Sequence, residues 1–361
     1  MSETIDRAPD IEPAGGEKET AVKASCGQDS VPSVNDAGGD RPGVRRVTRM
    51  VCYGVLLYLF LFIGQQYLLY GEYSLAGMLG GSLIPEEPSE FMMGLMILIS
   101  LTGSLILSWL YFSGKAEKGE LFEDRSLFRS VFRTNAKMSP GGFFGCLALI
   151  YVMQIVFIYI TELVEFLFNR IGYTLQYSEA MNADYNTSWT LLLYAVLLGP
   201  FAEEVVYRGY TMQGLKSNGR RFAIIASSLI FGLMHGDFQQ SMFTFFAGLV
   251  FAYVAMRYSI WFSLALHVFN NGILSEFLIW AGGHMTEEAY IIMMLIVLIV
   301  SVIVVVRLTR TKGKDLQAWL MAEDNCPGCW KSLVNIWFMI FLVYTVAEIW
   351  LTIMPMGITD F

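Results

Sequence analysis

Nine apolar segments dominate the 361-residue chain and restrict it to one class of fold. They cover residues 50–70, 91–112, 141–167, 189–211, 221–235, 239–257, 259–281, 289–308 and 333–354. A helix needs about 20 apolar residues to cross a bilayer, and most of these segments meet that length. The fifth and sixth segments are short, so an alternative interpretation is that one of them is a re-entrant segment that does not cross the membrane. Because charged residues are only 16% of the chain, against roughly 25% in soluble proteins, we expect an all-α polytopic membrane protein with about eight or nine transmembrane helices.

The basic residues sort to one side of these segments. With a cytoplasmic N-terminus, 23 of the 24 Lys and Arg residues fall in the predicted inside segments, and only Arg170 falls outside. The predicted outside loops carry acidic residues instead, such as Glu86 and Glu87. Since cytoplasmic loops carry an excess of Lys and Arg, the pattern predicts an integral protein of the cell membrane with its N-terminus in the cytoplasm.

Two adjacent glutamates and an arginine stand at the end of the apolar run that begins at Leu191. A carboxylate at membrane depth costs roughly 2.5–3.5 kcal/mol on insertion scales, so it indicates a functional site. Glu204 and Arg208 are four residues apart and can pair on one helix face. Glu203 has no basic partner at that spacing, which suits it to accept a proton from water.

Two further polar clusters follow within the next seventy residues. His235 closes the fifth apolar segment, four residues after Phe231. His267 and Asn271 lie one helical turn apart in the seventh segment, and both side-chain types can stabilise an oxyanion. Asn270 points elsewhere on such a helix, so Asn271 is the better candidate.

Each cluster also has a structural interpretation. A Glu–Arg pair can be an interfacial salt bridge, a lone His a packed residue, and His267 with Asn271 an interhelical hydrogen bond. Ser227 and Ser228 are expected to bond back to their own helix. Asp237 lies either at the mouth of the site or at a helix N-cap, and His284 is expected to be solvated. Three neighbouring segments together supply the groups that hydrolysis needs, which favours an active site.

At these residues the chain resembles the CPBP family, the CAAX-processing and bacteriocin-processing intramembrane glutamic endopeptidases, also called the Abi family. The family has three motifs in this order, EExxxR, FxxxH and HxxxN, and the resemblance covers roughly residues 185–280. The matching residues are Glu203, Glu204 and Arg208, then Phe231 and His235, then His267 and Asn271.

The resemblance implies a mechanism and a kind of substrate. It implies that Glu203 and His235 activate a water, that His267 and Asn271 stabilise the oxyanion, and that Glu204, Arg208 and Phe231 support the site. It implies no metal and no other cofactor. The expected partners are a peptide or protein substrate, either membrane-associated, prenylated or carrying a leader, and the lipid bilayer. No nucleic-acid partner is expected.

Other functions compatible with the same residues stay open. Glu203, His235 and His267 are also a possible zinc ligand set. A non-catalytic immunity or scaffold protein of the same family would keep the residues for structure. A proton-coupled transporter would use Glu203 and His235 as a relay, although the chain shows no internal repeat of the kind that transporters often have. The lone Cys326-Pro-Gly-Cys329 has no second Cys pair and no nearby His, which disfavours a metal or redox site there.

The predicted spans place two motif residues at different depths. At 1.5 Å per residue, Glu203 lies about 21 Å from the outer end of its span and His235 about 21 Å from the inner end of its own. In a core of about 30 Å these positions differ by roughly 12 Å. Either the span boundaries are misplaced or a helix is tilted or broken, and Pro200 is a plausible site for a kink.

Four parts of the chain are predicted. Residues 1–48 are rich in Gly, Ser, Pro and charged residues and contain no apolar run, so we expect a disordered cytoplasmic tail rather than a signal peptide. Residues 49–182 hold the first three spans. Residues 183–282 form the catalytic CPBP-type helical core, and residues 283–361 hold the C-terminal spans.

Overall fold

The computed structural model describes residues 43–80, 88–175, 188–322 and 326–355. Residues 1–42 of the predicted tail therefore lie outside the described residues. The first helix begins at Val44, so the end of the segment predicted as tail is helical. The described chain is almost entirely helical, which confirms the predicted all-α class.

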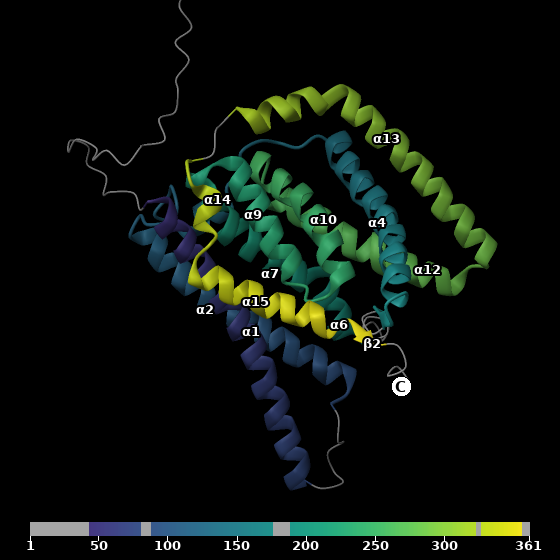
Figure 1. The fold of residues 1–361 in the computed structure, drawn as a ribbon, viewed down its shortest axis with the longest axis horizontal. Helices are drawn as coiled ribbons and strands as arrows, with labels where there is room; N and C mark the ends of the chain where they lie inside the picture. The colour runs from purple at the N-terminus through teal and green to yellow at the C-terminus, as the bar shows by residue number, and fades with distance from the viewer. Residues whose placement is uncertain (1–42, 81–87, 176–187, 323–325, 356–361) are drawn as a thin grey trace, which may run out of the picture. The chain divides into compact units, whose positions relative to one another are not determined.

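The first half of the described chain holds four helices and a short strand, and then enters the long helix of the site (Figure 1). These elements are α1 (Val44–Gly80), α2 (Glu90–Glu117), α3 (Leu127–Val131), α4 (Pro140–Asn169) and β1 (Tyr173–Thr174). One continuous helix then runs through α6 (Trp189–Leu193), η2 (Tyr194–Leu198), α7 (Gly199–Glu203), η3 (Glu204–Met212), α8 (Gln213–Leu215) and η4 (Lys216–Asn218).

The second half continues with α9 (Arg220–Leu233) and α10 (Phe238–Arg257). A second composite helix follows, made of α11 (Ile260–Phe269), η5 (Asn270–Phe277) and α12 (Leu278–His284). The chain then forms α13 (Glu287–Met321), α14 (Cys329–Ser332), α15 (Ile336–Leu351) and β2 (Met354–Pro355), and β2 pairs antiparallel with β1.

Each of the nine predicted segments contains a helix, but the helices differ in length. Among the described residues, seven are long and apolar enough to cross a membrane. The predicted spans 221–235 and 333–354 correspond to α9 and α15, which have 14 and 16 residues. At 1.5 Å per residue these two are about 21 and 24 Å long, less than the thickness of the hydrocarbon core. The protein is an integral membrane protein.

Short polar side chains start most of the helices. The Ser139 hydroxyl accepts from the backbone N–H of Gly142, and Pro140 occupies the first turn of α4, where its missing N–H costs nothing. The carboxylate of Asp237 accepts from the N–H of Gln240 at 2.7 Å and caps α10. Of the two roles considered for Asp237, the structure therefore supports the N-cap.

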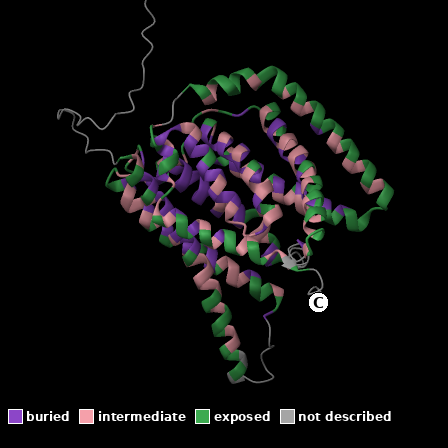
Figure 2. Cartoon of the chain, in the orientation of Figure 1, coloured by how far each residue is buried: buried purple, intermediate pink, exposed green. Residues whose placement is uncertain are grey.

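The helices that carry the motifs form the best buried part of the molecule. α9 packs between η3 and α10, and α10 also packs against α11. Figure 2 shows α9 largely buried, whereas α13 is exposed along most of its length. Many exposed side chains of α13 are apolar, including Ile291, Ile299 and Ile303, as expected for a lipid-facing helix whose main packing partner is α4.

A buried hydrogen-bond network fixes the turn between the two helices that carry Glu203 and His235. The side-chain amide of Asn218 donates to the hydroxyl of Thr48 at 3.0 Å. The Thr48 hydroxyl lies 2.7 Å from that of Ser332. One network thus ties η4 to α1 and α14, and so anchors the C-terminal segment to the core.

Candidate active site

Glu204 and Arg208 form the predicted pair, and the pair is buried. Oε1 of Glu204 lies 3.4 Å from Nη1 of Arg208, and each side chain is 1% exposed. The guanidinium also lies against two aromatic rings, 4.1 Å from the ring centre of Phe231 and 5.3 Å from that of Phe251. Because a buried charge is tolerated only when paired, Glu204 and Arg208 depend on each other.

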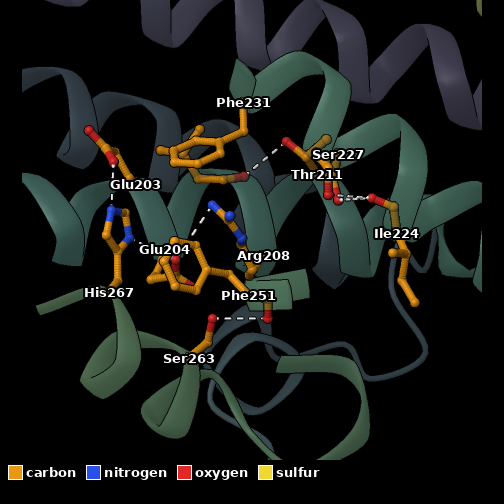
Figure 3. Close-up of polar contacts among 12 residues, drawn as sticks. Glu203, Glu204, Arg208, Thr211, Ile224, Ser227, Phe231, Phe251, Ser263 and His267 are labelled. Carbon is orange, nitrogen blue, oxygen red and sulfur yellow. Dashed lines mark hydrogen bonds and ion pairs between the residues drawn. The ribbon is translucent and has the colours of Figure 1, made fainter. Parts of the chain in front are cut away.

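His267 joins both glutamates. Its Nδ1 lies 3.0 Å from Oε1 of Glu204, and its Nε2 lies 3.5 Å from Oε2 of Glu203, as Figure 3 shows. The imidazole stacks on Phe251, with ring centres 4.6 Å apart and planes at 21°. The sequence motifs do not reveal this bridge, because spacing along the chain relates only residues of one helix.

The two adjacent glutamates have different environments. The side chain of Glu204 is 1% exposed and held from two sides, whereas that of Glu203 is 25% exposed. Four residues after Glu203 the helix carries Tyr207, so Glu203 has no basic partner within its helix. A carboxylate that is partly accessible and loosely held is the one of the pair that can meet water.

His235 lies beside the site without bonding to the glutamates. Its Nδ1 lies 2.9 Å from the carbonyl oxygen of Phe231 and 3.3 Å from the hydroxyl of Thr244. Nε2 makes no hydrogen bond to the described part of the chain. The Phe231 ring packs edge-on against His235 at 5.0 Å and against His267 at 5.8 Å, so one aromatic side chain separates the two imidazoles.

The structure removes the predicted difference in depth between Glu203 and His235. The helix that holds Glu203 continues to Asn218, seven residues beyond the predicted end at 211. Glu203 precedes the turn at Gly219 by 16 residues and His235 follows it by 16, which is about 24 Å along the helix axis in each case at 1.5 Å per residue. Because η3 and α9 pack together as a hairpin, the two residues reach the same level.

The asparagines of the third motif are engaged in hydrogen bonds. Nδ2 of Asn271 donates to the backbone oxygen of Ala195 at 2.8 Å, which ties η5 to η2. Nδ2 of Asn270 donates to Oδ1 of Asn271 at 3.0 Å. The structure therefore places Asn271 at the junction of the two composite helices, with one of its two amide hydrogens already used.

Three π-helical segments interrupt the site helices, and the helical pattern of the sequence does not predict them. The N–H of Gly199 donates to the carbonyl of Tyr194, five residues back, immediately before Pro200. Proline lacks an N–H and its ring clashes with the carbonyl four residues back, so a wider turn relieves the helix there. Pro200 was the only sequence signal for this irregularity. The other two segments, η3 and η5, carry Arg208 and Asn271.

The remaining polar candidates bond to the backbone of their own helices. Ser227 and Ser228 both donate to the carbonyl of Ile224, at 3.1 and 2.8 Å, which confirms the predicted bonding to their own helix. His284 is exposed and its Nδ1 lies 2.8 Å from the carbonyl oxygen of Trp280, consistent with the predicted solvated position.

The described residues form neither of the two possible metal sites of the sequence, the Glu203, His235 and His267 set and the Cys326–Cys329 pair. No group of three or more His, Cys, Asp or Glu side chains there is arranged to hold a metal ion. The zinc set of Glu203, His235 and His267 is not brought together, because His235 turns toward Phe231 and Thr244. Cys329 is a free thiol, 2% exposed.

The fold and the site together define a polytopic α-helical membrane protein with a buried site of two carboxylates, a guanidinium and an imidazole. Residues 185–273 match the sequence model of the family described as Type II CAAX prenyl endopeptidase Rce1-like. This match, to a family of the CPBP group, covers about a quarter of the chain and falls on the segment in which the motifs predicted the resemblance. Searches of curated proteins and of solved structures find no match.

Proposed function

We propose that this protein is an intramembrane endopeptidase that hydrolyses a peptide bond with a water activated by Glu203 and His235. One observation supports this function above the others. His267 faces both glutamates, with Glu204 fixed against Arg208 and Glu203 left 25% exposed. A structural salt bridge needs only the buried pair, whereas general-base chemistry needs an accessible carboxylate held in place beside it.

In the proposed reaction, water bound at Glu203 attacks the scissile carbonyl carbon. A carbon–oxygen bond forms, one proton passes from the water to Glu203, and the carbonyl electrons move onto oxygen. His235 holds the water through Nε2, because its Nδ1 is engaged by the Phe231 carbonyl and Thr244. Collapse of the intermediate breaks the carbon–nitrogen bond, and the proton on Glu203 goes to the leaving amine.

The supporting residues hold Glu203 and its neighbours in position. His267 is a positioning residue for Glu203, and it is itself held by Glu204 at 3.0 Å and by stacking on Phe251. Arg208 neutralises Glu204 and so permits the carboxylates to lie side by side in the protein interior. Asn271 and His267 are the oxyanion donors that the family resemblance implies.

The proposed substrate is a membrane-associated peptide or protein segment, with a prenylated C-terminal tail as the first candidate. The name of the matched family refers to prenyl substrates, and the match covers the helices that carry the site. An apolar anchor would keep such a segment at the bilayer, where the helices around Glu203 lie. The proposed host is the cell membrane, with the N-terminus in the cytoplasm, as the distribution of Lys and Arg predicts.

The test uses the full chain in lipid nanodiscs with quenched fluorescent peptides, prenylated and not. We expect the wild type to cleave the prenylated peptide and Glu203→Gln to lose activity by at least about 10²-fold, since the lost group is the general base. Glu162→Gln is the matched control, because Glu162 is an exposed carboxylate in α4, outside the site. Cleavage by Glu203→Gln at the wild-type rate would rule out the proposed role.

A further inference from the structure

Tyr207 is a buried phenol in the site that no sequence motif singles out. Its side chain is 0% exposed, and its hydroxyl makes no hydrogen bond within the described part of the chain. Leaving a buried hydroxyl unpaired costs about 1–3 kcal/mol. Buried polar groups are usually paired, so an exception inside a candidate active site indicates a specific use.

Tyr207 lies close to the groups that are proposed to react. It follows Glu203 by one helical turn, the spacing at which side chains of a helix are neighbours. Its ring centre lies 5.2 Å from that of Phe231, the ring that also contacts both imidazoles. Electrostatic neighbours of its hydroxyl include Tyr58, Glu203 and Arg208.

The two donors that the family resemblance implies for the oxyanion are already engaged, whereas both Nη atoms of Arg208 lack a hydrogen-bond partner among the described residues. Hydrolysis by activated water places negative charge on the carbonyl oxygen, and donors aimed at that oxygen supply much of the catalysis. His267 presents both ring nitrogens to carboxylates, and Asn271 already donates one hydrogen to the carbonyl of Ala195. The Tyr207 hydroxyl is a donor next to Glu203 with no competing acceptor.

We propose that the Tyr207 hydroxyl donates a hydrogen bond to the oxyanion formed when water at Glu203 attacks the substrate carbonyl. The inference rests on the proposed peptidase function and adds a catalytic residue to it. No proton leaves the phenol: the water proton goes to Glu203, and Tyr207 O–H only stabilises the charge on oxygen. The substrate carbonyl enters beside Glu203, the accessible carboxylate, and meets the phenol one turn further along the same helix.

The experiment compares Tyr207→Phe with Tyr210→Phe in the quenched-peptide assay. Tyr210 is the matched control, because it is equally buried on the same helix but its ring packs on Phe112, with ring centres 4.5 Å apart, and not on Phe231. We expect Tyr207→Phe to lower kcat by about 10²–10³-fold, the usual effect of losing one oxyanion donor, with KM changed less than about threefold. Tyr210→Phe is expected to keep kcat within about threefold of the wild type.

Two further measurements separate chemistry from folding. A peptide with a phosphinate at the scissile position mimics the tetrahedral intermediate, and its affinity should fall in Tyr207→Phe by a factor close to the fall in kcat/KM. Replacing Tyr207 by 4-aminophenylalanine, which keeps a donor at the ring tip, should restore at least a tenth of the wild-type kcat. Equal losses in the Phe and aminophenylalanine variants would show a packing role and overturn the proposal.

The outcomes also separate this inference from the function on which it rests. If the wild type cleaves and Glu203→Gln does not, but Tyr207→Phe cleaves like the wild type, the oxyanion role of Tyr207 is wrong and the peptidase function stands. If the wild type cleaves none of the peptides and does not bind the phosphinate, the peptidase function itself fails.

Discussion

Nδ1 of His267 lies 3.0 Å from Oε1 of Glu204, and this contact joins the first and third motifs inside the protein. Glu204 is also 3.4 Å from Arg208, so an imidazole and a guanidinium share one buried carboxylate. The first and third motifs thus form one charge network, and Phe231 of the second motif packs against its guanidinium and its imidazole. The network gives Glu203 a fixed neighbour while leaving its carboxylate partly accessible.

The buried pair predicts strong coupling between Glu204 and Arg208. Arg208→Met leaves a buried carboxylate without its main counter-charge and should lower the free energy of unfolding by about 3–5 kcal/mol. The double variant Glu204→Gln/Arg208→Met should lose less than the sum of the two single variants, because it leaves no uncompensated charge. Denaturant unfolding in mixed micelles measures the free energy of unfolding of the wild type, the two single variants and the double variant, which together form a double-mutant cycle.

The control for this cycle is an exposed ion pair of the same chain. Lys312 lies 3.9 Å from Asp315, and both side chains are at least 70% exposed. Lys312→Met should change the free energy of unfolding by less than about 1 kcal/mol. Strict additivity of the Glu204 and Arg208 variants would mean that the two charges do not depend on each other.

Gly232 should be required for the position of His235. A Cβ at residue 232 would lie 2.8 Å from the backbone oxygen of Ser241 and 2.9 Å from Cβ of Phe245, in the contact between α9 and α10. Gly232→Ala should therefore lower the free energy of unfolding by about 1–3 kcal/mol and reduce cleavage, because the helices must separate. Gly141→Ala has open space around its Cβ and should be neutral or slightly stabilising.

A surface contact predicts a dependence of stability on pH. Lys115 donates to Glu120 at 2.8 Å and Arg46 lies 2.9 Å from its other oxygen, so these cations hold the pKa of Glu120 below its usual range. The contact therefore stabilises the fold above the unfolded pKa of about 4.3, and the gain is lost as pH falls through the lower folded pKa.

The test compares thermal unfolding of the wild type and Glu120→Gln between about pH 7 and pH 3. The wild type should be more stable near neutral pH, by less than about 1 kcal/mol because Arg46 is 64% exposed. The difference should vanish at the acid end. A constant difference across the range would show that the Glu120 charge does not link α1 to the end of α2.

Local patterns in the sequence predicted much of the fold and part of the site. Apolar length located a helix in every predicted segment, and the i,i+4 spacing predicted the Glu204–Arg208 contact. Helical preference also accounts for Ser227 and Ser228, whose hydroxyls return to the backbone of their own helix. These features depend on interactions within a few residues, so one sequence is enough to predict them.

Other features depend on tertiary structure and could not be predicted from the sequence. The apolar run ending at 211 marks only the hydrocarbon layer, whereas the helix continues through polar residues to Asn218. The bridge from His267 to both glutamates requires two helices more than fifty residues apart to pack in one register. Tyr207 was missed because a tyrosine in an apolar helix is ordinarily a packing residue.

Chemical rescue tests most directly whether Glu203 is the carboxylate that activates water. Glu203→Ala and Glu204→Ala, each in nanodiscs with the prenylated peptide, would be assayed with increasing formate. The account predicts that formate restores cleavage in a saturable manner to Glu203→Ala, whose accessible side chain leaves room for it, and restores none to Glu204→Ala, whose carboxylate is a buried brace. Rescue of Glu204→Ala alone, or undiminished cleavage by Glu203→Ala without formate, would contradict the assignment.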